Sequence, residues 1–103
     1  EDAFADLVFH ELLHTWVGEH LIRPSPLFHK YENEARLTRN HLHLMAVQKL
    51  IYQKLNRDDL IQMIQNQYNR HAEYKRAWDI VNAEGIQVFI DELKPPAKIT
   101  TGR

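Results

Sequence analysis

The chain has 103 residues, a formal net charge of −1, 44% hydrophobic and 26% charged residues, and no cysteine. This composition suits one soluble domain with a modest core and excludes disulfides, thiolate metal sites and cysteine nucleophiles. The near-neutral charge without a basic stripe gives no reason to expect a nucleic-acid partner. No apolar run approaches the ~20 residues of a membrane span. The absence of cysteine and of a visible signal peptide fits a cytoplasmic location.

Helical periodicity dominates the first half of the chain. Apolar residues at helical spacing predict a helix over residues 2–17, with Gly18 as a stop and the segment RPSP (23–26) as a break. We expect a loop over residues 27–31. A long second helix is then predicted over residues 32–55.

The second half predicts shorter helices. The patterns indicate helices over residues 60–69 and 73–83, and a helix in preference to a strand over residues 86–93. No convincing strand is predicted, so the expected fold class is all-α. We expect one helical domain over residues 1–94 and a tail over residues 95–103.

The segment FHELLHTW places two imidazoles and a carboxylate on the first predicted helix. His10 and His14 lie one helical turn apart, so both rings project from the same face and can share one cation. Glu11 is offset by about 100° and lies beside such an ion, where it can take a proton from a zinc-bound water. These residues predict a Zn²⁺ site with Glu11 as the general base.

This HExxH pattern on an uncharged helix, His10 to His14, resembles the zincin metallopeptidases. The segment Asn33-Glu34-Ala35 is similar to the glutamate-ligand, thermolysin-like branch, and lies at a comparable distance from His14. The resemblance implies Glu34 as the third metal ligand. It also implies an active-site helix packed on a long helix that carries this glutamate, and a sheet that is absent here or lies upstream.

His20 is the alternative third ligand. It lies six positions after His14, as in the metzincin branch, HExxHxxGxxH. However, the glycine stands at position 18 rather than 17, and Met45 and Met63 fall in helical patterns instead of a tight turn. Glu34 is therefore favoured over His20.

Three further residues are candidates for supporting roles. Thr38 and His41 follow Glu34 at i+4 and i+7 on the predicted second helix, where either could orient a ligand histidine. The thermolysin-like branch carries an aspartate at the place of Thr38, so the chain departs from the pattern there. Tyr31 is a candidate oxyanion donor, and His43 is expected to face solvent.

The predicted function is zinc-dependent hydrolysis of peptide bonds in a peptide or protein substrate. Two alternatives stay open: a non-catalytic helical module with a structural or vestigial metal site, and a helical interaction module without metal. An open fourth coordination position distinguishes the enzyme from the structural site.

Overall fold

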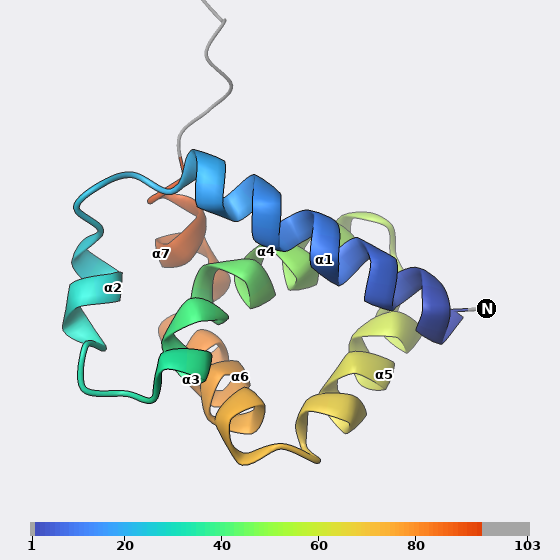
Figure 1. The fold of residues 1–103 in the computed structure, drawn as a ribbon. Helices are drawn as coiled ribbons and strands as arrows, with labels where there is room; N and C mark the ends of the chain where they lie inside the picture. Colours follow the sequence, from blue (N-terminus) through green and yellow to red (C-terminus); the bar gives the residue numbers. More distant parts are fainter. Residues whose placement is uncertain (1, 94–103) are drawn as a thin grey trace, which may run out of the picture.

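The computed structural model describes residues 2–93, and within this range the chain is all-α, as predicted (Figure 1). The helices are α1 (Asp2–His20), α2 (Pro26–Lys30), α3 (Arg36–Asn40), α4 (Leu42–Lys54), α5 (Asp58–Tyr68), α6 (Ala72–Glu84) and α7 (Ile86–Ile90). The predicted tail, residues 95–103, lies outside the described residues. None of the described helices combines the length and apolar character needed to cross a membrane.

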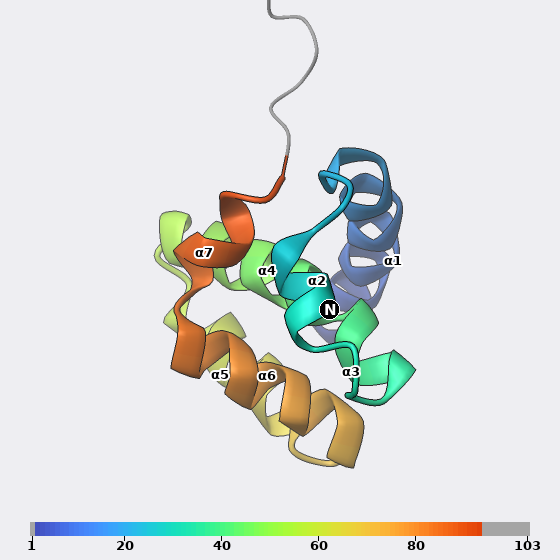
Figure 2. The same ribbon diagram turned by 90° about the vertical axis from the view of Figure 1, so that its left-hand side faces the viewer.

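Helix α4 is the centre of the molecule. It packs against α1, α5, α6 and α7, and Figures 1 and 2 show α1 lying across it, with α5 and α6 joined by a short turn. The first turns of α4 are buried as a continuous run, residues 41–48. Trp78 from α6 and Phe89 from α7 are also buried in the core. Burial on all sides explains why this stretch shows no clear apolar stripe, and its polar members His41, His43 and Gln48 are hydrogen-bonded.

Two predicted boundaries are wrong near the middle of the chain. The expected loop at 27–31 is mostly α2, because Ser25 caps it by accepting the N–H of Phe28 and Pro26 occupies its first position. The expected long helix 32–55 begins only at Arg36 and is interrupted at His41 between α3 and α4. Residues 31–34 form turns.

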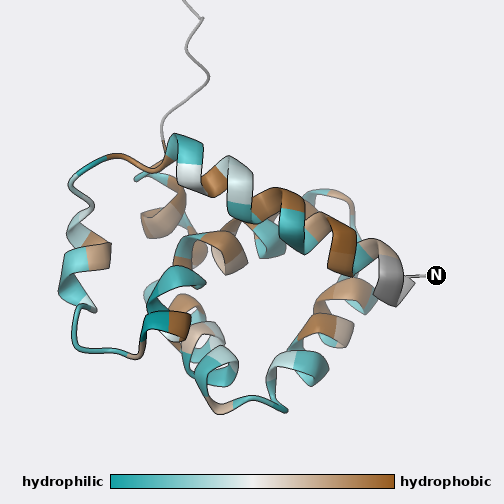
Figure 3. Cartoon of the chain, in the orientation of Figure 1, coloured by the Kyte–Doolittle hydropathy of each residue, from teal (hydrophilic) through white to brown (hydrophobic). Residues whose placement is uncertain are grey.

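Only one face of α1 is packed. Leu13 and Val17 are buried, whereas Leu7 and Leu12 are 57% and 65% exposed. Figure 3 shows hydrophobic (brown) stretches along α1 between hydrophilic (teal) ones. The uncharged flanks of the histidine motif are therefore buried on the α4 side only.

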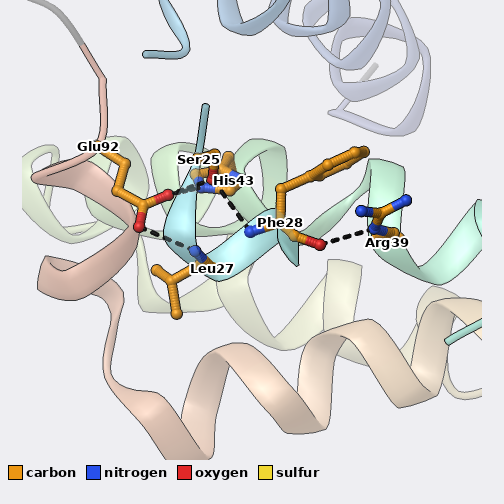
Figure 4. Close-up of polar contacts among 6 residues, drawn as sticks. All are labelled: Ser25, Leu27, Phe28, Arg39, His43 and Glu92. Carbon is orange, nitrogen blue, oxygen red and sulfur yellow. Dashed lines mark hydrogen bonds and ion pairs between the residues drawn. The ribbon is translucent and has the colours of Figure 1, made fainter. Parts of the chain in front are cut away.

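A buried carboxylate ties the last described turn to α2 and α4 (Figure 4). Glu92 accepts hydrogen bonds from the hydroxyl of Ser25, from the N–H of Leu27 at 3.0 Å and from Nε2 of His43 at 3.0 Å. His43 is only 3% exposed. The expectation that His43 faces solvent is wrong, since the ring is needed as a donor inside the fold.

Candidate metal centre

Three imidazole rings meet between α1 and the junction of α3 and α4. One ligand atom from each of His10, His14 and His41 can be chosen such that all three lie within 4.8 Å of one another. His10 and His14 come from adjacent turns of α1, with ring centroids 4.8 Å apart. His41 occupies the position between α3 and α4 where the predicted long helix is interrupted.

The spacing of two of these nitrogens suits a tetrahedral ion. Nε2 of His10 and Nε2 of His41 are 3.3 Å apart. Two nitrogens bound to zinc at 2.0–2.1 Å with a tetrahedral angle lie about 3.3 Å apart. This pair of imidazole nitrogens is therefore spaced as Zn²⁺ requires, and one ring nitrogen of His14 lies within 4.8 Å of both.

His41 is held in one orientation and one tautomer. Its Nδ1 lies 2.7 Å from the carbonyl oxygen of Leu37, which can only accept, so Nδ1 carries the proton and Nε2 presents a lone pair. Tyr74 packs on the ring with centroids 4.7 Å apart. Burial lowers the pKa of His41 to about 4, which keeps the ring neutral near pH 7.

A chain of hydrogen bonds reaches His10 from a buried carboxylate. Asp6 accepts from Nε2 of Gln48 at 2.8 Å and from the hydroxyl of Tyr52. The hydroxyl of Tyr68 donates to Oε1 of Gln48 at 2.6 Å and lies 3.5 Å from Nδ1 of His10. Burial lowers the pKa of His10, and the neighbouring imidazole of the cluster adds to this effect.

The contact between His10 and His41 is compatible with two tautomers of His10. Without a metal, a proton on Nε2 of His10 can be donated to Nε2 of His41. With Nδ1 of His10 protonated toward the oxygen of Tyr68, two lone pairs face each other at 3.3 Å and a cation between them becomes favourable. The space between the two Nε2 atoms can therefore be occupied by a hydrogen-bonding proton or by a metal ion.

The three histidines open into a cleft of about 960 Å³. Its walls come from α1, from the α3–α4 junction, and from the segment around the α5–α6 turn. Glu11 lines the same cleft and its side chain is exposed. The carboxylate predicted as general base thus shares an accessible space with the imidazoles.

The structure does not bring Glu34 to the imidazole pair. Its carboxylate accepts from Arg76 of α6, with Nη2 at 2.7 Å and Nε at 3.2 Å from its oxygens. The guanidinium of Arg76 lowers the pKa of this carboxyl group. Glu34 lies in the turn before α3 instead of on a helix, and the third member of the cluster is His41.

The remaining candidates are placed elsewhere or act structurally. The ring of His20 stacks on Trp16 and its Nδ1 lies 2.8 Å from the carbonyl oxygen of that residue. Thr38 is buried and donates to the carbonyl oxygen of Glu73 at 2.9 Å. The hydroxyl of Tyr31 donates to Glu84 at the end of α6. Of the three predicted supporting residues, only His41 reaches the candidate metal centre.

The membership of His41 in the histidine cluster was not predicted from the sequence, and neither was the hydrogen-bonded chain from Asp6 through Gln48 to Tyr68. One signal was present: His41 shares a helical face with Leu37, whose carbonyl orients it. The hydrogen-bonded chain carries no comparable local signal, because its members are 20 to 42 positions apart.

Comparison with known protein families, with curated proteins and with solved structures finds no match to this chain.

Proposed function

We propose that the protein is a zinc-dependent hydrolase of peptide bonds, with Zn²⁺ held by His10, His14 and His41. The observation that carries the proposal is the convergence of three imidazole nitrogens, two of them at tetrahedral spacing, in a cleft that also contains Glu11. The pattern resembles the zincins in its HExxH helix and departs from the glutamate-ligand branch in its third ligand.

Each residue has a defined task in this proposal. Three protein ligands would leave one coordination position of a bound zinc open to water or substrate. A bound zinc ion would lower the pKa of water in that position towards ~7 and polarise the scissile carbonyl. Glu11 accepts the proton from the attacking water and delivers it to the leaving amine. The carbonyl oxygen of Leu37 fixes the tautomer of His41, and the hydroxyl oxygen of Tyr68 can accept from Nδ1 of His10, which leaves Nε2 of His10 available for the metal.

The experiment that tests the proposal is Glu11→Gln in zinc-loaded protein. Zinc content by elemental analysis is expected to stay at one ion per chain, because Glu11 is not a ligand. Hydrolysis of a mixed peptide library, followed by mass spectrometry, is expected to fall by at least about a hundredfold, the usual size of a general-base contribution.

Two outcomes separate the alternatives. Stoichiometric zinc without hydrolysis by the wild-type protein would favour a structural metal site. Hydrolysis by Glu11→Gln at the wild-type rate would exclude Glu11 as the base. His14→Ala serves as the matched control that loses the metal itself.

A further inference from the structure

Arg39 is fixed within the wall of the cleft. Its Nε–H donates to the carbonyl oxygen of Phe28 at 2.7 Å, and the guanidinium lies over the Phe28 ring, 3.7 Å from the centroid. Figure 4 shows the side chain meeting the Phe28 carbonyl through this one nitrogen. A guanidinium held in this way loses little further conformational freedom when it binds a ligand.

The charge of Arg39 has no anionic partner among residues 2–93. Arg57 and Arg76 form ion pairs with Asp59 and Glu34, whereas Arg39 makes only its two contacts with Phe28. Its terminal nitrogens therefore keep their donors available. Such a planar fork matches a carboxylate in a bidentate arrangement.

Arg39 and Arg23 line the same cleft as the three histidines. The acidic lining residues do not compensate them. Asp6 is buried and accepts a hydrogen bond from Gln48, and Glu11 is the general base in the proposed function. Neither carboxylate pairs with Arg39 in the described residues. Among the described residues, Arg39 therefore lines the cleft without an acidic partner, and it lies in α3 two positions before His41.

We propose that Arg39 binds a carboxylate of the substrate, so that the cleft selects peptides carrying a negative charge near the scissile bond. This inference rests on the proposed function for its hydrolytic part. The carboxylate can be the C-terminus of the peptide or an acidic side chain. Leu37, 39% exposed in the cleft wall, offers an apolar surface for a neighbouring residue of the substrate.

The first arm of the test uses metal-free protein, so that the probe cannot bind zinc directly. Binding of N-acetyl-leucine, N-acetyl-leucinamide and N-acetyl-glutamate α-amide is measured by NMR titration. The variants are Arg39→Gln, Arg39→Lys and, as the matched control on the same helix, Arg36→Gln. Arg36 is exposed and does not line the cleft.

Wild type and Arg36→Gln are expected to prefer a carboxylate probe over the amide by about tenfold to a hundredfold, as for charge-assisted hydrogen bonds. Arg39→Gln should abolish this preference and Arg39→Lys should retain part of it. Preference for N-acetyl-leucine indicates the C-terminal carboxylate, and preference for the glutamate probe indicates an acidic side chain. Equal binding of all three probes by the wild type, or an unchanged preference in Arg39→Gln, would overturn the inference.

The second arm compares hydrolysis of peptide acids, peptide amides and acidic peptides by zinc-loaded protein. A preference in kcat/KM that disappears in Arg39→Gln supports the inference for the reaction itself. Carboxylate binding without any hydrolysis supports the anion site at Arg39 and contradicts the hydrolase proposal. Hydrolysis without a charge preference supports the hydrolase proposal and contradicts the anion site.

Discussion

The identity of the third metal ligand can be decided by one pair of substitutions. His41→Gln removes the imidazole but keeps a side-chain amide that can donate to the Leu37 carbonyl, which His41 now satisfies. Glu34→Gln keeps the shape of the side chain predicted from the sequence as the ligand and removes its charge. The proposed site requires that only the first substitution weakens zinc binding.

The expected magnitudes differ widely. Zinc binding to a four-ligand protein site is worth about 10–16 kcal/mol, or about 2.5–4 kcal/mol for each ligand, so loss of His41 should weaken affinity by about a hundredfold to a thousandfold. Glu34 pairs with Arg76, and their side chains are 25% and 54% exposed. Breaking such an exposed, solvent-screened pair should cost little folding stability and should leave zinc affinity unchanged.

The assay is competition for zinc against a chromogenic chelator, supported by visible spectra of the cobalt-substituted proteins, which report a change in coordination. Circular dichroism melts show whether each variant is folded before its affinity is compared. Wild-type affinity in His41→Gln combined with a large loss in Glu34→Gln would refute the structural reasoning and restore the prediction made from the sequence.

Three further results are expected. Tyr68→Phe removes the hydroxyl 3.5 Å from Nδ1 of His10, so zinc affinity measured by the same competition should fall about tenfold to a hundredfold. In metal-free protein, the pKa of His41 is lowered from 6.5 to about 4, so unfolded chains take up a proton that folded chains refuse. Stability measured by urea denaturation should therefore fall by up to about 3 kcal/mol from pH 6.5 towards pH 4, and this slope should flatten in His41→Gln. Gly85 has φ +91°, so Gly85→Ala should destabilise by about 1–3 kcal/mol, whereas Gly18→Ala within α1 should stabilise by about 0.5–1 kcal/mol; equal effects in thermal melts would contradict the backbone argument.

The helices and the histidine pair were predictable because both depend on local spacing. The 3.6-residue period defines α1, and the i, i+4 relation alone brings His10 beside His14. The same reasoning identified α5, α6 and α7 with ends within a few residues of the observed ones.

That His41 joins the histidine pair was not predictable in this way. The periodic pattern continues smoothly through residues 32–55, and nothing in it shows that Arg76, 42 positions later, holds Glu34 in a turn. At His41 the chain leaves α3, which packs on α6, and enters α4, which packs on α1, α5 and α7 as well as on α6. Pairings across long sequence distances override local periodicity here, and they decide which side chain completes the cluster.

The position of Glu92 has a practical consequence for shortened versions of the protein. Cutting the chain after Ile90 would retain the residues of all seven helices found in residues 2–93. It would also remove Glu92, the acceptor of three hydrogen-bond donors on Ser25, Leu27 and His43, and each donor left without an acceptor costs about 1–3 kcal/mol. For a domain whose whole stability is typically about 5–15 kcal/mol, that trim can decide between a folded and an unfolded product.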